Sequence, residues 1–208
     1  MKKLLVLVAV LLTGCASQVQ KTDLSAFQAA KPRSILIVPA VNKSLDVDAP
    51  DYLLTTLSVP LGEKGFYVFP VHTTKVVLQQ EGFYEGEQVH QQPPEKLAKL
   101  FGADVVLYVT INRWDAQYAV FATTVTVNFD YRLVAKDGTE IWRANKQMAY
   151  TPQSQNTGHP LANLIVAAVQ AAVARAKPDY MPLANMANYD VFVAGPTAIP
   201  NGPYLTVQ

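Results

Sequence analysis

The side chains that most often perform catalysis are few and scattered in this chain of 208 residues. His72, His90 and His159 lie in polar or proline-flanked segments. None of them stands at metal-ligand spacing from a second histidine, the cysteine or a carboxylate. We therefore expect three surface histidines, with no structural metal and no cofactor.

Three neighbouring glutamates, Glu81, Glu85 and Glu87, come closest to a catalytic acid pair. A glycoside hydrolase holds two carboxyl groups about 5–10 Å apart across a cleft. These glutamates instead flank a glycine-rich turn, which favours a solvated loop. The sequence also contains no GxSxG, HExxH or phosphate-binding glycine loop. We predict a protein that is not an enzyme and has no catalytic residue; a hydrolase with an unrecognised site is an alternative.

Cys15, the only cysteine, indicates a different chemistry, because its thiol can accept a lipid. It ends the segment Leu12-Thr13-Gly14-Cys15, which resembles the lipobox of bacterial lipoproteins. Two lysines, Lys2 and Lys3, and nine apolar residues from Leu4 to Leu12 precede the cysteine, as in a secretory signal. Nine apolar residues are too few to span a bilayer, which needs about 20.

The lipobox resemblance implies that Cys15 carries a diacylglyceryl group and that the new amino group carries a third acyl chain, such as palmitate. Stable anchoring requires two membrane signals, so three chains are sufficient. Ala16 follows the cysteine, and by the same resemblance alanine favours export to the outer membrane. We therefore predict a lipid anchor in the outer membrane, facing the periplasm. The alternative is an ordinary cleaved signal that happens to end at Cys15.

Composition limits the remaining possibilities. Without its signal the chain has about 194 residues, enough for one domain. Of its 17 basic residues, Lys2 and Lys3 leave with the signal, so the rest nearly balance the 16 acidic residues. This balance gives no attraction to nucleic acid. We divide the chain into a signal peptide (1–14), a lipidated cysteine and tether (15–31), an α/β periplasmic domain (32–178) and a proline-rich segment packed on it (179–208).

The pattern of the first half predicts short strands alternating with helices. Strands are expected at Ser34–Val38 and Phe66–Phe69, each stopped by a proline. A helix beginning near Asp48 has its apolar stripe at Leu53, Leu54, Leu57 and Leu61, and Pro60 should kink or break it. Two further helices are expected, over Lys75–Glu81 and from Pro93 to Gly102, with inward Leu97, Leu100 and Phe101. A short helix over Asp23–Ala30 is an option within the tether, and Phe83–Gln92 is predicted to be irregular.

The second half predicts an antiparallel meander. Ala103–Ile111 and Thr123–Val134 alternate with period two, and the second of these has one wholly polar face. The Asp137-Gly138 pair predicts a type I′ turn leading into a return strand at Glu140–Tyr150. The fold class is therefore α+β, with a mixed, mostly antiparallel sheet of about five strands and helices packed on it.

Two segments are candidate interfaces. The first joins the meander strands and contains Arg113, Trp114, Tyr118 and Phe121, which form either an exposed aromatic patch or the packed end of a hairpin. The second is a helix over Leu161–Lys177, which is apolar nearly all round. Its small residues permit a homodimer, unless the C-terminal segment from Asp179 covers them within one chain; the helix residues concerned are Ala168, Ala171 and Ala172.

The chain resembles the GNA-type neisserial lipoproteins, a family of Gram-negative outer-membrane lipoproteins of unknown function. Segments that carry the resemblance include Val47–Tyr52, Gly65–Pro70, Leu100–Asp104, Ala167–Val173 and Asp179–Ala184. The order of elements also resembles the TolB N-terminal fold and CsgG-type secretion lipoproteins. The resemblance implies no catalytic residue.

Two functions are compatible with these features. The first is a non-catalytic interaction module in an envelope assembly or secretion and transport complex. Its partners would be other envelope proteins, CsgG-like lipoproteins among them. The alternative is a regulator of a peptidoglycan synthase, suggested by a penicillin-binding-protein activator of TolB-like fold.

Overall fold

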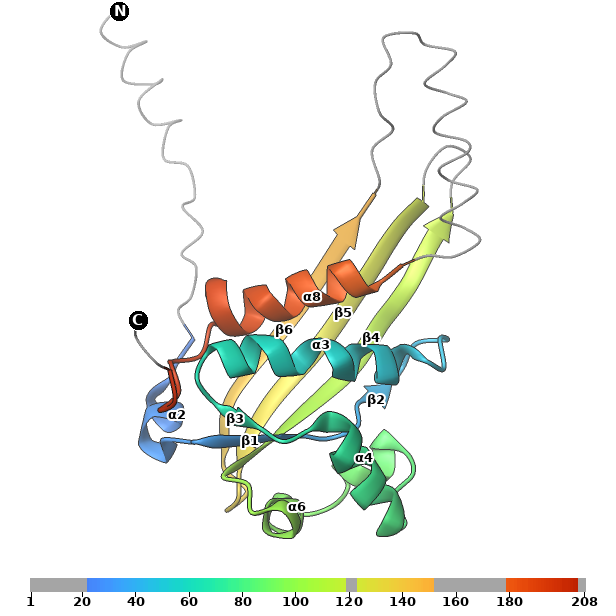
Figure 1. Ribbon diagram of the computed structural model, residues 1–208. Coiled ribbons are helices and arrows are strands. Elements are labelled where there is room, and N and C mark those ends of the chain that lie inside the picture. Colours follow the sequence, from blue (N-terminus) through green and yellow to red (C-terminus); the bar gives the residue numbers. More distant parts are fainter. Residues whose placement is uncertain (1–21, 119–122, 152–178, 206–208) are drawn as a thin grey trace, which may run out of the picture.

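The computed structural model describes residues 22–118, 123–151 and 179–205. Figure 1 shows a twisted sheet with helices on both faces. The sheet is mixed: its shorter strands run parallel and its three longest strands form an antiparallel meander. The predicted α+β class and mostly antiparallel sheet are confirmed.

The sheet has six strands in the order β3-β1-β4-β5-β6, with β2 paired to β4 beyond the end of β1. The strands of the β4–β5 hairpin appear where β-branched and aromatic residues gather in the sequence. Their bounds are β1 (Ser34–Ile37), β2 (Val41–Asn42), β3 (Tyr67–Val68), β4 (Val105–Tyr118), β5 (Thr123–Ala135) and β6 (Glu140–Tyr150).

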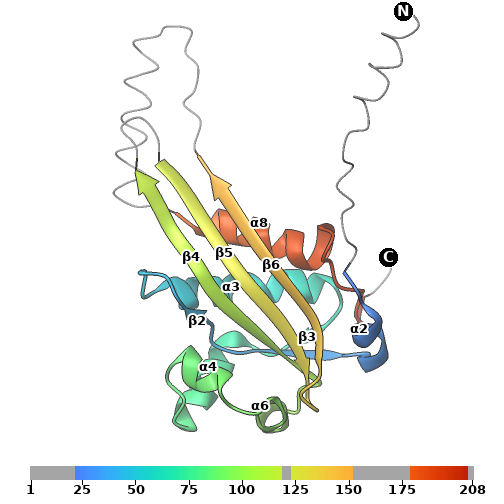
Figure 2. The same ribbon diagram turned by 180° about the vertical axis from the view of Figure 1, so that it is seen from behind.

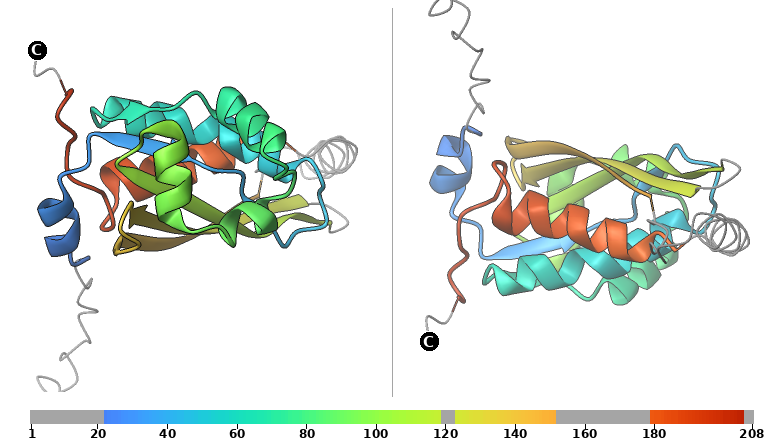
Figure 3. Two further views of the ribbon diagram at one scale, coloured as in Figure 1. Left: turned by 90° about the horizontal axis from the view of Figure 1, so that it is seen from below. Right: turned by 90° about the horizontal axis from the view of Figure 1, so that it is seen from above.

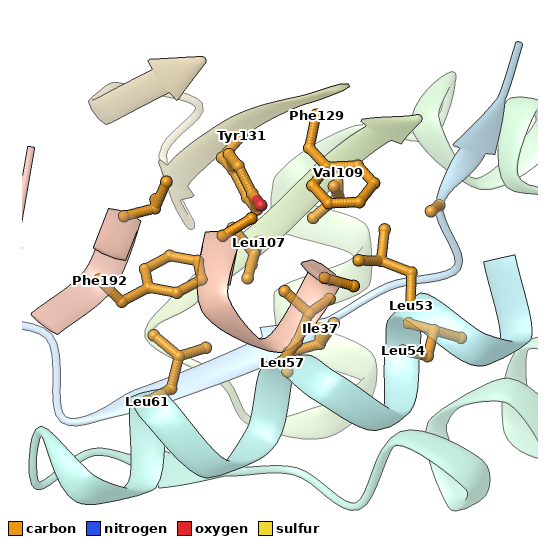
Figure 4. Packing of buried hydrophobic residues seen from close by; sticks show 14 of the residues in the cluster. Ile37, Leu53, Leu54, Leu57, Leu61, Leu107, Val109, Phe129, Tyr131 and Phe192 are labelled. Carbon is orange, nitrogen blue, oxygen red and sulfur yellow. The ribbon is translucent and has the colours of Figure 1, made fainter. Parts of the chain in front are cut away.

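One face of the sheet, here called the inner face, is covered by two helices. Helix α3 (Ala49–Glu63) packs over β4 and β2, and helix α8 (Met181–Tyr189) packs over β5 and β6. The two helices lie side by side (Figure 3). Between them and the sheet lies the main core, where Leu53, Leu57 and Leu61 of α3 meet the inward residues of β4 and β5 (Figure 4).

The opposite face, the outer face, is only partly covered. Helices α4 (Val71–Gln80), α5 (Gly86–His90) and α6 (Pro94–Phe101) close a second core over β1 and the first part of β4. The alternation predicted for Ala103–Ile111 is confirmed, since Val105, Leu107, Val109 and Ile111 belong to the main core and Val106 and Tyr108 to the second. Figure 2 shows the rest of the outer face of β4, β5 and β6 without a described helix over it.

Both ends of the described chain pack on this domain. Helix α2 (Ser25–Ala30) lies against β6 and buries Phe27, which confirms the optional helix and shows that this part of residues 15–31 is not a free tether. At the other end, α8 continues into the π-helix η1 (Asp190–Ala194). The segment after Asp179 was predicted to be packed but irregular; it is packed, and largely helical, because Pro182 occupies a first-turn position that tolerates proline.

Several predicted helix boundaries were wrong. Pro60 was predicted to kink or break the helix; it lies inside α3 without breaking it, because the buried side chains on both sides of it hold the last turn against the core. Helix α4 begins at Val71 rather than Lys75, and a short helix, α5, lies within the segment predicted to be irregular. Leu100 is exposed, whereas Leu97 faces inward and Gly102 ends α6 with positive φ as expected.

The turn between β5 and β6 is a hairpin loop of another type than predicted. Only Gly138 has positive φ, at 87°, whereas a type I′ turn needs it at both central residues. The Gly138 amide donates to the Ala135 carbonyl at 2.9 Å, and the Ala135 amide donates to the Thr139 carbonyl at 2.8 Å. This is a three-residue loop with glycine at its left-handed position.

Candidate interaction surfaces

The outer face of β4, β5 and β6 carries polar side chains in rows that cross the three strands. In one row Tyr108 lies opposite Arg132, and Arg132 lies opposite Arg143. In the next row Thr110 lies opposite Asp130, and Asp130 lies opposite Asn145. These six side chains line a cavity of about 600 Å³ together with Tyr131 and Ala144. The predicted polar face of β5 is therefore the floor of a hollow.

Hydrogen bonds between amide and carboxylate side chains order this face. Asp130 accepts from Asn112 Nδ2 at 2.6 Å and from Asn145 Nδ2 at 2.7 Å. Asn128 accepts from both of the same amide groups and donates to Gln147 Oε1 at 3.0 Å. These bonds join Asn112, Asn128 and Asp130 to the two polar residues of β6, Asn145 and Gln147, in one network across the three strands.

The two arginines of this face, Arg132 and Arg143, both pair with one glutamate, Glu140. Glu140 receives two hydrogen bonds from Arg143, which lower the pKa of its carboxyl group. Arg132 is farther away, with Nη1 3.8 Å from Glu140 Oε2, and its guanidinium lies over the Tyr108 ring, 5.4 Å from the centroid. Two arginines directly opposite each other repel, and Glu140 offsets this mainly on the Arg143 side.

His90 is partly buried beside this face, which corrects the expectation of a surface histidine. Its ring meets Tyr108 edge to face at 5.0 Å, and Nε2 lies 3.1 Å from the Pro39 carbonyl oxygen. Burial lowers the pKa of His90 to about 4, so the ring is neutral at pH 7. A neutral ring donates from Nε2 to that carbonyl. Burial also raises the pKa of Tyr108 to about 12.

Of the residues predicted to form an aromatic patch, Trp114 and Arg113 have described side chains, and these two lie on opposite faces of β4. Trp114 is 2% exposed and packs at a tilt against Tyr180 and Phe129, with ring centroids 5.1 and 6.0 Å away. Trp114 therefore belongs to the core, which was the second of the two alternatives. Arg113 points to the other face and pairs with Asp115 at 3.0 Å. The backbone of Tyr118 pairs with Thr123 at the end of β4.

The remaining candidate residues lie outside the described residues. They are Cys15 with the signal peptide, Phe121, His159, and the alanines of the expected helix, namely Ala168, Ala171 and Ala172. The lipid anchor and the homodimer therefore remain predictions.

A second candidate surface is a groove between α3 and α8, which the sequence patterns did not indicate. The groove has a volume of about 490 Å³ and is lined by Val59, Met148, Met186 and Tyr189, among others. Val59 is 62% exposed, and Met186 and Tyr189 are each 50% exposed. The C-terminal segment was predicted to be irregular, so no helical periodicity was available to place its exposed apolar side chains.

Within the described ranges, no three histidine, cysteine, aspartate or glutamate side chains come together as a metal site. Glu81 and Glu85 are exposed near the glycine turn, as expected, and Glu87 is exposed on α5. In the same ranges no helix combines the length and apolar character needed to cross a bilayer.

The fold and these surfaces define a class of protein: a small α+β domain with a mixed sheet, one polar sheet face and one exposed apolar groove. The chain belongs to the family described as "Putative lipoprotein GNA1162-like", whose model matches residues 22–204. Membership confirms the family resemblance found in the sequence.

Two relatives and one more distant solved structure are similar to this chain. The chain is 34% identical over 183 residues to "Putative lipoprotein NMB1124/NMB1162" of Neisseria meningitidis serogroup B, covering 86% of this chain and 84% of that protein. The crystal structure of lipoprotein GNA1162 from Neisseria meningitidis matches 69% of this chain and 99% of its own, with a TM-score of 0.57 and 34% identity. PelC from Paraburkholderia phytofirmans, crystallised as a dodecamer, covers 81% of this chain and 89% of its own at 12% identity, with a TM-score of only 0.49. The predicted TolB-like and CsgG-like fold remains a prediction.

Proposed function

We propose that this protein is a lipid-anchored lipoprotein of the outer membrane that binds other envelope proteins within an assembly or secretion and transport complex. It performs no catalysis itself. Membership of a lipoprotein family supports the anchor, together with the lipobox pattern at Cys15.

The observation that carries the binding role is the groove between α3 and α8. Exposed apolar side chains scattered singly are common, but a contiguous group marks a protein or membrane contact. Val59, Met186 and Tyr189 form such a group, and Glu63 and Asp190 line the same groove. An apolar centre with a polar rim is the usual composition of a protein interface.

Site-specific photocrosslinking in living cells tests this role. The photoreactive residue p-benzoylphenylalanine replaces Tyr189 in the full-length protein, and in a matched control it replaces Tyr84. Tyr84 is 65% exposed and lies between α4 and α5, away from the groove. We expect a discrete adduct with another envelope protein from position 189 and none from position 84.

The identity of the adduct separates the two functions. A secretion or assembly lipoprotein supports the proposal, whereas a peptidoglycan synthase supports the alternative role as its regulator. Equal adducts from both positions, or no adduct from position 189, would contradict a binding role for the groove.

A further inference from the structure

The cavity on the outer face of the sheet is lined by two polar groups, the Tyr108 hydroxyl and the Arg132 guanidinium, that have few partners in the described chain. The Tyr108 hydroxyl is buried and has no hydrogen-bond partner there. Arg132 has only a long ion pair, with Nη1 3.8 Å from Glu140 Oε2, and its guanidinium lies over the Tyr108 ring. Buried polar groups are nearly always paired, so an orphaned hydroxyl beside a cavity calls for an explanation.

Positive charge is concentrated at one end of this cavity. Arg132 and Arg143 are directly opposite each other on adjacent strands, and Glu140 engages Arg143 closely but stays 3.8 Å from Arg132. Arg132 is half-exposed and therefore accessible. A planar guanidinium with free N–H groups binds a carboxylate in two parallel hydrogen bonds.

Negative charge lies at the other end. Asp130 is two residues before Arg132 on β5, so the two side chains share a face and their Cα atoms are about 7 Å apart. Asp130 accepts two amide hydrogen bonds, and a carboxylate has acceptor sites for two more. This end would repel a simple anion but would attract a cationic group.

We propose that the cavity lined by Tyr108, Arg132 and Asp130 binds a zwitterionic amino-acid head group. The ligand carboxylate lies against Arg132 and accepts the Tyr108 hydroxyl hydrogen, and its α-ammonium group donates to Asp130. Thr110, on the floor between the two poles, is within the same cavity. The raised pKa of Tyr108, about 12, keeps its hydroxyl protonated as a donor at neutral pH.

Three probes of similar length test the positive end of the cavity, at Arg132, and its negative end, at Asp130, separately. Meso-diaminopimelate carries both groups at each end, pimelate carries only the carboxylates, and 1,5-diaminopentane carries only the amines. Their binding to the full-length protein in detergent is measured by saturation-transfer NMR titration. We expect diaminopimelate to bind at least about tenfold more tightly than either of the other two.

Substitutions of the lining residues test which side chain contacts which group of the ligand. Arg132→Gln should weaken diaminopimelate binding at least about tenfold, and Asp130→Asn should do the same while leaving pimelate binding unchanged or stronger. Tyr108→Phe should weaken binding without lowering the melting temperature, because the hydroxyl has no partner in the described chain. Arg113→Gln is the matched control, since Arg113 does not line the cavity, and should bind as the wild type does.

A second binding experiment shows whether the head group belongs to a wall peptide or to a free amino acid. A soluble cell-wall fragment that ends in diaminopimelate, if bound more tightly than the free amino acid, identifies the wall peptide as the source; equal affinity identifies the free amino acid. Equal affinity for all three small probes, or full binding by Arg132→Gln, would overturn the proposal. Tyr189 lies in the groove between α3 and α8, whereas the cavity is on the outer face of the sheet. The photocrosslinking test of the groove and the binding test of the cavity can therefore fail independently.

Discussion

The Tyr131 hydroxyl donates a hydrogen bond of 2.6 Å to Asn188 Oδ1, which joins strand β5 to the end of helix α8 inside the core. Asn188 Nδ2 donates to Thr56 Oγ1 at 2.7 Å, and the Thr56 hydroxyl donates to the Leu53 carbonyl oxygen at 2.6 Å. Burial raises the pKa of Tyr131 well above its ordinary value, so the hydroxyl remains a donor. One hydrogen-bonded relay therefore links the sheet to both inner helices.

We expect Asn188→Leu to destabilise the protein by about 2–4 kcal/mol. The substitution leaves the fully buried Tyr131 hydroxyl without its acceptor and places a branched side chain in a closely packed site. Chemical denaturation followed by circular dichroism measures the loss. Asn185→Leu is the matched control, because Asn185 is an exposed residue of the same helix, and it should change stability by less than about 0.5 kcal/mol. Equal losses in the two variants would show that the relay does not hold α8 in place.

Gly138→Val should cost about 1–3 kcal/mol of stability, because a β-branched residue resists the φ of 87° that this position adopts. A Cβ atom there would meet no other atom within 4 Å, so the loss comes from backbone strain alone. Gly138→Asn provides the control, since asparagine tolerates the left-handed region better. The thermal midpoint should fall clearly for valine and much less for asparagine; an equal fall would point to a cause other than φ.

The second half of β4, which the sequence left ambiguous, shows why part of the sheet could not be predicted from sequence. Asn112 is an extra residue in the ladder, since Ile111 pairs with Phe129 and Arg113 pairs with Asn128. Such a bulge reverses which alternate residues face the core. Inward positions are therefore odd-numbered up to Ile111 and even-numbered from Trp114. A simple period-two pattern locates both strands but cannot place Trp114 in the core.

Sequence patterns predicted the buried face of one inner helix and not that of the other. The inward stripe of α3 was predictable because Leu53, Leu57 and Leu61 recur at helical spacing. The inward side of helix α8 was not predictable, because its alanines and asparagines give only a weak apolar pattern. Ala184 and Ala187 are nevertheless fully buried, since small side chains let α8 approach its neighbours closely. The polar cavity was also hidden, because cross-strand opposition of Arg132 and Arg143 depends on a register that the sequence does not specify.

Replacing Cys15 with serine should abolish lipidation, because only a thiol can accept the diacylglyceryl group in the lipobox pattern. The variant should remain unprocessed or be found away from the outer membrane. Metabolic labelling with palmitate, followed by membrane fractionation, measures both effects. Label retained by Cys15→Ser would disprove the anchor assignment, and a Ser17→Ala control should label as the wild type does.

The stability of the protein should depend on His90 between pH 6.5 and about 4. Burial lowers the pKa of this histidine from 6.5 in the unfolded chain to about 4 in the folded one. In that interval the unfolded state binds the additional proton, so the contribution of neutral His90 is complete above pH 6.5 and is lost as the pH falls towards 4. The total is on the order of 3 kcal/mol.

The comparison with His90→Gln isolates this contribution from the titration of the acidic residues. Glutamine cannot take up a proton in this range, yet its amide can still donate towards the Pro39 carbonyl that His90 Nε2 contacts at 3.1 Å. The free energy of unfolding, measured by urea denaturation from pH 7.5 to pH 4, should fall less steeply in the variant than in the wild type. Parallel curves would mean that His90 is as solvated when folded as when unfolded. A direct NMR titration of its ring would then give a midpoint near 6.5 instead of about 4.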